Sequence, residues 1–158
     1  MPAAMKLEIA AIGELPIYDF DLQEKGFPAA ATKLRDQIVS ADALLFASPE
    51  YNWTVGAPLK NAIDWMSRFQ PQPFMNKPAA VFSASGGPMG GVRGQYDLRR
   101  ILSGLGVHWL ARPEIFIGMA ASKFSPEGRL TDETARKLMT EQMAGLLDWI
   151  VRMKRAFA

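Results

Sequence analysis

The fold follows from the stretch Ser48-Pro49-Glu50-Tyr51-Asn52-Trp53-Thr54-Val55-Gly56-Ala57-Pro58-Leu59-Lys60-Asn61-Ala62-Ile63-Asp64-Trp65. It connects a short apolar run, residues 43–47, through a polar and aromatic turn to a segment whose apolar side chains have helical spacing. In open sheets covered by helices, ligands bind outside the carboxyl ends of the parallel strands. The turn that begins at Ser48 is therefore the first candidate for a binding site.

The order of strand, loop and helix recurs along the rest of the chain. Strands are expected at residues 6–11, 43–47 and 78–84, followed by an interrupted last strand at 107–110 and 114–117. Helices are expected after Pro28, around Leu59 to Met66, around Leu98 to Leu105, and from a cap at Thr131 or Asp132 to about Lys154. This alternation predicts an α/β fold, with one domain (residues 1–158) built on a parallel sheet that is covered on both sides.

Composition limits the classes of function. The chain has 158 residues, no cysteine and a formal charge of +2. The lack of cysteine excludes thiol nucleophiles, zinc thiolate sites and disulfides, so any redox role needs a cofactor. The charge is too small to predict nucleic-acid binding, and no apolar run approaches the ~20 residues of a membrane span. We expect a cytoplasmic protein with no metal site and no nucleic-acid or membrane partner.

A second candidate loop, residues 83–91, is rich in glycine and follows the strand at 78–84. Glycines let the backbone approach a ligand closely, although an ordinary strand-to-helix turn would also explain them. The loop lacks both the Gly-Lys-Ser/Thr of a P-loop and the GxGxxG fingerprint. Tyr51 and Trp53 in the first loop offer stacking surfaces, and Asn52 offers a paired donor and acceptor. The two loops together fit a planar heteroaromatic ligand.

Several polar residues have a structural alternative to a role in binding. Glu50 is either a ligand contact or an exposed acid that shapes the turn. Lys60, Asn61 and Asp64 are expected to stabilise the helix that follows rather than to catalyse a reaction. His108, the only histidine, has no neighbouring metal ligand or carboxylate in the sequence and is expected to be structural.

These motifs resemble those of the NAD(P)H-dependent FMN reductases of flavodoxin-like fold, a family that includes quinone, chromate and azo-dye reductases. The resemblance covers essentially the whole chain. It rests on Pro49-Glu50-Tyr51-Asn52, on Pro58 to Trp65 with Ser67-Arg68, and on Ser85-Gly86-Gly87 with Gly90-Gly91, Arg93, Gln95, Leu98 and Arg99.

The resemblance implies a three-layer flavodoxin-like fold and a set of flavin contacts. One side of the isoalloxazine ring of FMN would be lined by Pro49, Glu50, Tyr51 and Asn52, and the other by Ser85, Gly86 and Gly87. NAD(P)H would pass hydride to the flavin, which would then reduce a quinone, flavin, metal-oxyanion or azo acceptor, with no catalytic protein acid or base.

The resemblance also implies a homodimer or homotetramer. Arg93, Tyr96 and Glu114 match positions that lie near a subunit interface beside the flavin, where a hydrogen-bonded ion pair would hold the subunits together. A solvated surface pair fits the same residue types.

One unit of the family pattern is not matched. The family's first unit, a strand, a Gly-Ser-x-Arg phosphate loop and a helix that together span ~30 residues, has no counterpart in this sequence. Residues 6–11 correspond to the family's second strand. The fold is therefore expected to be shortened at the N-terminus, with two strand edges unpaired. A start codon assigned too late, a truncation and a real variant are the competing explanations. A non-catalytic module with weak or no flavin binding is the alternative function, whereas an electron-carrier flavodoxin is disfavoured by the basic charge.

Overall fold

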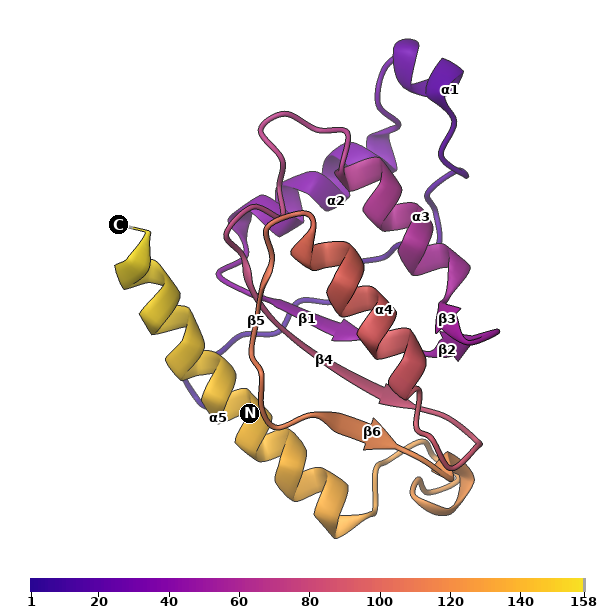
Figure 1. Cartoon of the computed structure of the whole chain (residues 1–158), viewed down its shortest axis with the longest axis vertical. Helices are drawn as coiled ribbons and strands as arrows, with labels where there is room; N and C mark the ends of the chain where they lie inside the picture. Colours follow the sequence, from indigo (N-terminus) through magenta and orange to yellow (C-terminus); the bar gives the residue numbers. More distant parts are fainter. Residues whose placement is uncertain (158) are drawn as a thin grey trace.

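Parallel strands form the centre of the protein, which a computed structural model describes over residues 1–157. Strand β1 (Leu44–Ala47) pairs with β4 (Pro78–Ala84), and the other edge of β4 pairs first with β5 (His108–Trp109) and then with β6 (Ile115–Ile117) (Figure 1). The interrupted last strand predicted at 107–110 and 114–117 is thus confirmed.

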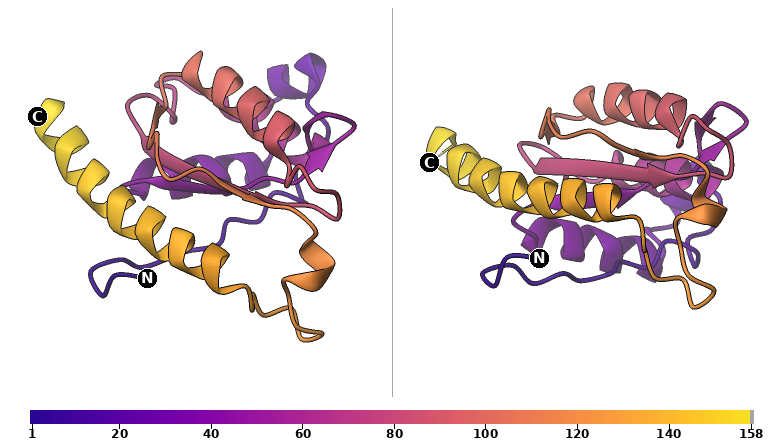
Figure 2. Two further views of the ribbon diagram at one scale, coloured as in Figure 1. Left: turned by 60° about the horizontal axis from the view of Figure 1, so that its bottom comes forward. Right: turned by 90° about the horizontal axis from the view of Figure 1, so that it is seen from below.

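Two sets of helices pack on this sheet. The apolar sides of α2 (Ala29–Ser40), α3 (Ala57–Met66) and α4 (Val92–Ser103) form the main core with Ala79 and Val81 of β4. Because side chains alternate along a strand, Ala80 points the other way and packs against α5 (Glu133–Ala156). The helices α4 and α5 accordingly lie on opposite faces of the sheet (Figure 2). This arrangement confirms the predicted three layers.

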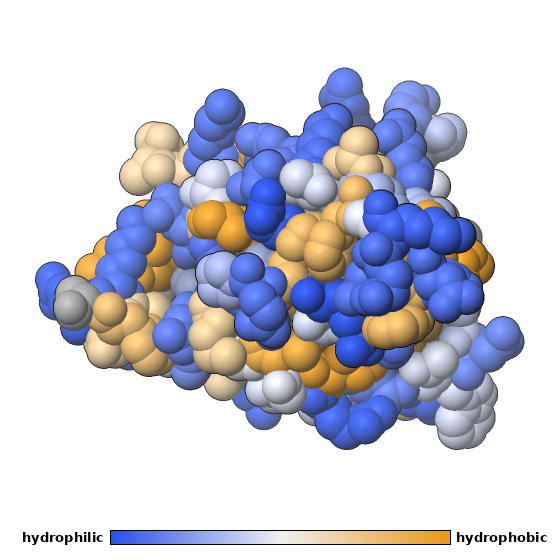
Figure 3. Space-filling model, turned by 90° about the horizontal axis from the view of Figure 1, so that it is seen from above, coloured by the Kyte–Doolittle hydropathy of each residue, from blue (hydrophilic) through white to orange (hydrophobic). Residues whose placement is uncertain are grey.

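Three short elements lie around this core. They are α1 (Phe20–Glu24), the antiparallel hairpin of β2 (Glu50–Tyr51) and β3 (Thr54–Val55), and the 3₁₀ helix η1 (Ala120–Ser122). The face of the molecule at the top of Figure 1, where α1 stands out, carries mainly hydrophilic side chains with smaller apolar areas between them (Figure 3). Within residues 1–157, no helix is both long and apolar enough to cross a membrane.

The strand predicted at residues 6–11 is wrong, because these residues form no strand. Met5 packs against the buried cluster of Ala80 and Leu146, and Ile12 packs against the main core, so the segment is held at both ends. Between them Leu7 and Ile9 are 56% and 87% exposed. A strand needs a neighbouring backbone to pair with, and in the described residues β1 pairs only with β4. The sequence pattern of a strand is therefore present without the partner that would make it one.

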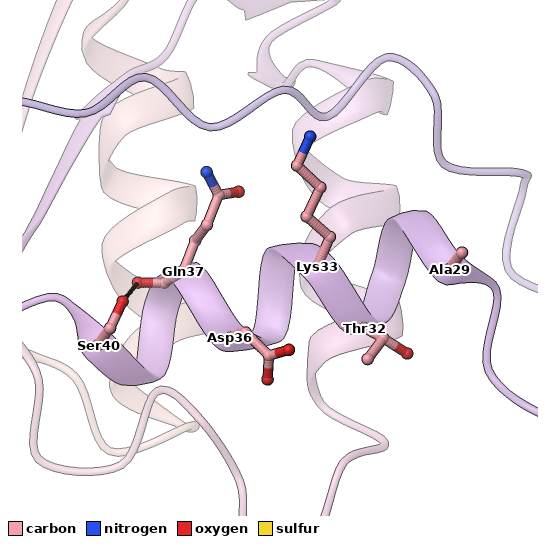
Figure 4. A pocket seen from close by; sticks show the side chains of 6 residues that line it. All are labelled: Ala29, Thr32, Lys33, Asp36, Gln37 and Ser40. Atoms are coloured by element: carbon pink, nitrogen blue, oxygen red, sulfur yellow. Dashed lines mark hydrogen bonds between the residues drawn. The ribbon is translucent and has the colours of Figure 1, made fainter.

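The same segment borders an open groove along α2. The groove is lined by Ala29, Thr32, Lys33, Asp36, Gln37 and Ser40 (Figure 4). Gln37 Nε2 donates to Glu8 Oε1 at 2.7 Å and ties the N-terminal segment to the helix. All six lining residues come from one helix, and none belongs to either candidate loop.

Candidate functional site

The two candidate loops leave the same end of the sheet. Strands β1 and β4 are parallel, and Ala47 at the end of β1 is level with Phe82, two residues before β4 ends. Ser48 N–H extends this pairing by donating to Phe82 O at 3.1 Å. The predicted contact residues at 49–52 and 85–87 therefore lie together beyond the carboxyl ends of the strands, as expected for a parallel sheet.

The first loop folds into the β2–β3 hairpin. Its two turn residues, Asn52 and Trp53, have positive φ angles of 48° and 72°. Such a turn matches the right-handed twist of the strands, but it favours asparagine and glycine at these positions rather than a bulky residue. Asn52 therefore suits its place, whereas Trp53 occupies a left-handed conformation that is unusual for an aromatic side chain. The side chains of Tyr51 and Asn52 are exposed.

Glu50 fastens this hairpin to the start of α4. Its Oε2 accepts from the backbone N–H of Arg93 at 2.9 Å and of Gly94 at 3.2 Å, and its Oε1 accepts from the Arg93 guanidinium at 3.1 Å. A carboxylate is favoured there because a helix N-terminus carries unpaired N–H groups and partial positive charge. Burial, the largest influence, raises the pKa of Glu50, but the hydrogen bonds from Gly94 and Arg93 together lower it below its ordinary 4.5. Glu50 is thus a structural anion whose side chain points at α4.

Further contacts fix the hairpin on the helix. The Arg93 guanidinium lies 3.9 Å from the centre of the Trp53 ring, and Thr54 Oγ1 donates to Asp97 at 2.7 Å. A Cβ on Gly94 would lie only 3.0 Å from Thr54 O, so glycine at this position lets the two elements touch. The hairpin is consequently part of a rigid unit with α4.

The glycine-rich loop is clamped at its ends and open between them. Ser85 N–H donates to Ile117 O at the end of β6, and Ser85 O accepts from Ala120 N–H, each at 2.9 Å. Met119 N–H donates to Gly87 O at 3.0 Å. Gly90 has a φ of 61°, and a Cβ there would lie 2.6 Å from the carbonyl carbon of Phe116. A Cβ on Gly86 or Gly87 would instead meet nothing within 4 Å. These two glycines therefore present bare backbone to open space.

A buried glutamine, which the sequence analysis names only as part of a motif and without a role, holds this loop in place. Gln95 is fully buried, and its Nε2 donates to Ser83 Oγ and to Ile115 O, each at 2.7 Å. Ser83 Oγ in turn donates to Gly90 O. The available signal is an amide side chain at helical spacing from the core residues Leu98 and Leu102.

The three residues predicted at an interface do not form one network within the chain. Tyr96 OH donates to Glu114 Oε1 at 3.0 Å, and the second oxygen of Glu114 accepts from Arg112 at 3.0 Å. Arg93 is instead paired with Glu50. Tyr96 and Arg112 are exposed at the surface, so this part of α4 is accessible in the single chain.

The polar residues of α3 stabilise the fold, as predicted. Lys60 and Asp64 form an ion pair one helical turn apart at 2.6 Å. Asn61 accepts from Tyr18 N–H at 2.7 Å and donates to Pro16 O at 2.9 Å, while the indole of Trp65 also donates to Pro16 O. They anchor the connection between the N-terminal segment and α2.

His108 makes contacts that fit its predicted structural role. Its Nε2 lies 3.4 Å from Asn76 Oδ1, and its ring centre lies 5.2 Å from that of Phe157. Its carbonyl accepts from the indole of Trp149 at 2.9 Å, which joins β5 to α5.

Comparison with known proteins assigns the family. The NADPH-dependent FMN reductase family model matches residues 2–122. The chain is 47% identical to an NAD(P)H-dependent FMN reductase of Pseudomonas aeruginosa, over 98% of this chain and 83% of the relative. It is 39% identical to a quinone reductase of Escherichia coli, over 97% of this chain and 83% of the relative.

A solved structure agrees with the sequence relatives. The flavoenzyme NAD(P)H:acceptor oxidoreductase FerB of Paracoccus denitrificans superposes with a TM-score of 0.84 at 34% identity, covering 94% of this chain and 81% of that chain. The likeness includes the arrangement of parallel sheet and helices described above. The chain belongs to the NADPH-dependent FMN reductase family.

Proposed function

We propose that this chain is an FMN-dependent NAD(P)H oxidoreductase whose flavin ring lies between the β2–β3 hairpin and the glycine-rich loop. The observation that carries the proposal is the bare backbone of Gly86 and Gly87, which shares an edge of the sheet with the exposed side chains of Tyr51 and Asn52. The family supports the cofactor, since its relatives are named for FMN and NAD(P)H.

The residues present fit a flavin ring. Pro49, Tyr51 and Asn52 would hold one side of it, and the backbone of residues 85–87 the other. Close by, the buried hydroxyl of Ser48 has no hydrogen-bond partner among the described residues, as expected at a polar ligand site. The Glu50 carboxylate is engaged by α4, so Glu50 would border the ring through its backbone. For the same reason the N-terminus of α4 would not hold the phosphate.

The chemistry divides between cofactor and protein. Bound FMN would supply the transfer of reducing equivalents from NAD(P)H to an acceptor. The protein's part is to orient the ring and shape access to it, which suits a loop clamped by Gly90 and Gln95. The part of the chain that the structure describes shows no group of three or more His, Cys, Asp or Glu side chains able to hold a metal.

The acceptor, assembly and location complete the proposal. A quinone is the acceptor supported by the E. coli relative, which is named a quinone reductase. The surface around Tyr96, Arg112 and Glu114 would form the contact of a homodimer or homotetramer, and we expect a single cytoplasmic domain. Exposed polar and aromatic side chains on α4 suit such an interface.

A flavin titration tests the function. FMN is added to the purified protein, and the visible spectrum is recorded before and after NADH or NADPH under nitrogen. We expect bound flavin that is bleached by NADH or NADPH and re-oxidised by a quinone. Absence of FMN binding at high concentration would favour the non-catalytic module instead.

A matched pair of variants locates the ring. Gly87→Val places a side chain in the space assigned to the flavin and is expected to abolish FMN binding. The fold should tolerate the change, because the new Cβ meets no protein atom within 4 Å. Gly13→Val makes the same change at another open position and is expected to bind FMN normally. Equal FMN affinity in the two variants would show that the ring lies elsewhere.

A further inference from the structure

Trp53 has a placement that packing does not explain. Its side chain is 71% exposed at the tip of the β2–β3 hairpin, which projects from the body of the protein (Figure 1). Its φ of 72° lies in the left-handed region, where glycine and asparagine are favoured. Neither burial nor turn geometry favours tryptophan here, and strained residues of this kind gather at functional sites.

The ring of Trp53 is nevertheless held in one orientation. The Arg93 guanidinium covers one face at 3.9 Å from the ring centre, and Arg93 is itself fixed by Glu50. Because one face is covered while most of the side chain is exposed, the opposite face is open to solvent. A flat aromatic surface that is fixed on one side and free on the other is a stacking platform.

This platform stands at the rim of the proposed flavin site. Trp53 follows Asn52 directly, and Arg93 comes two residues after Gly91, the last glycine of the glycine-rich loop. The contact between Arg93 and Trp53 therefore bridges the two loops that would hold the ring. Asn52 and Trp53 are the two turn residues of the hairpin, so the indole lies directly beside the residues proposed to line the ring.

The charges around the platform indicate the kind of ring that it accepts. Arg93 and Glu50 form an ion pair whose charges offset each other, so Arg93 does not present a free positive charge to an anionic dinucleotide. Stacking on an aromatic face depends on a flat π surface and needs no charge on the ligand. An uncharged planar ring suits this environment best.

We propose that Trp53 is a specificity-determining residue that stacks on the quinone acceptor beside the flavin. The inference rests on the proposed function for the identity of the reaction. Arg93 positions the indole, and the free indole face selects planar aromatic acceptors over compact inorganic ones.

Binding is tested by NMR without turnover. The chain has four tryptophans, and three indole N–H groups donate within the protein, from Trp65 to Pro16, from Trp109 to Arg99 and from Trp149 to His108. Titration of the protein with 1,4-naphthoquinone, with and without FMN, should shift the indole signal that is missing in Trp53→Tyr, with little change in the other three. A Trp53 signal that stays in place, or equal shifts of all four signals, would overturn the proposal.

Kinetics give a second readout. Trp53→Gly removes the ring while relieving the turn, and Trp53→Tyr keeps an aromatic face. The ratio of kcat/KM for naphthoquinone to that for ferricyanide is expected to fall about 10-fold in Trp53→Gly, which corresponds to roughly 1.4 kcal/mol of stacking, and to recover in Trp53→Tyr. Phe20→Ala, at an exposed aromatic of α1, serves as the control.

The two proposals fail in different ways. An unchanged ratio in Trp53→Gly overturns the role of Trp53 while leaving the oxidoreductase intact. If Trp53→Gly loses FMN affinity together with the fall in the kcat/KM ratio, the indole contacts the flavin itself, and the acceptor role is overturned as well. If the wild-type protein does not oxidise NADH, the proposed function fails, and the titration with naphthoquinone still decides whether Trp53 binds a planar ring.

Discussion

Replacing Glu50 by glutamine tests whether this carboxylate joins the hairpin to α4. The variant keeps one oxygen that can accept the N–H groups of Arg93 and Gly94, which now lie 2.9 and 3.2 Å from Oε2. It loses the negative charge, and it turns an amide NH₂ toward the Arg93 guanidinium. The change therefore isolates charge from shape.

The expected destabilisation is the sum of two interactions that need the negative charge. The ion pair contributes about 1 kcal/mol, discounted because the Arg93 side chain is 36% exposed, and the charge at the helix N-terminus contributes roughly 0.5–1 kcal/mol. Together the free energy of unfolding should fall by about 1.5–2 kcal/mol. With a urea m-value of about 2 kcal/mol/M, the midpoint moves down by about 0.8–1 M.

Equilibrium urea unfolding, followed by far-UV circular dichroism, measures this shift. Glu141→Gln, which removes an exposed carboxylate from α5, is the matched control and should leave the midpoint unchanged.

The stability difference between wild type and Glu50→Gln should also depend on pH. The pKa of Glu50 is lowered in the folded protein, so its stabilising effect is complete above the unfolded value of about 4.5 and declines as the pH falls through the folded value. The gap between wild type and Glu50→Gln should thus be widest near neutral pH and narrow below about pH 4.5. A gap that is absent at pH 7, or that does not change with pH, would refute the reasoning.

Three further substitutions probe the same framework. Gly90→Ala should destabilise the protein by more than about 3 kcal/mol, since its Cβ would lie 2.6 Å from backbone of Phe116 at a positive φ, and thermal unfolding measures the loss. Gln95→Leu leaves Ile115 O without its 2.7 Å donor and should cost about 1–3 kcal/mol in urea unfolding, with weaker FMN binding in a fluorescence titration. Lys77→Met removes two bonds to carbonyls at the end of α2, 2.8 and 2.6 Å long, and should cost about 1 kcal/mol in urea unfolding, with no change in FMN affinity.

Local patterns predict most of the fold. The helix that ends the chain is expected from a cap at Thr131 or Asp132, and Asp132 does accept from Ala135 N–H at 2.8 Å at the start of α5. Helical spacing places Ala62 and Ile63 inside, where they are buried. These features are readable because caps and periodicity act within a few residues of the chain.

Features that depend on partners distant in the chain cannot be predicted from the sequence. The alternation of Leu7 and Ile9 is typical of a strand, yet the segment has no backbone to pair with among the described residues. The β2–β3 hairpin carries Asn52 but lacks the glycine that usually marks such a turn, and it forms against α4 where Gly94 leaves room. Motifs therefore predict the two loops that the fold brings to one end of the sheet, whereas the role of Glu50 as an anchor emerges only in the folded structure.

The anchoring of the hairpin changes how the site should respond to mutation. Glu50 holds the hairpin to the first turn of α4, and Gln95, one residue beyond Gly94, holds the glycine-rich loop to the same helix through Ser83. Both proposed walls of the flavin site are thus fastened within one turn of α4. Displacement of this turn would move the two walls together, so substitutions at Glu50 and Gln95 should show coupled effects on FMN affinity although the two side chains bind different partners. On this reasoning the start of α4, rather than either loop, would set the spacing of the proposed flavin site.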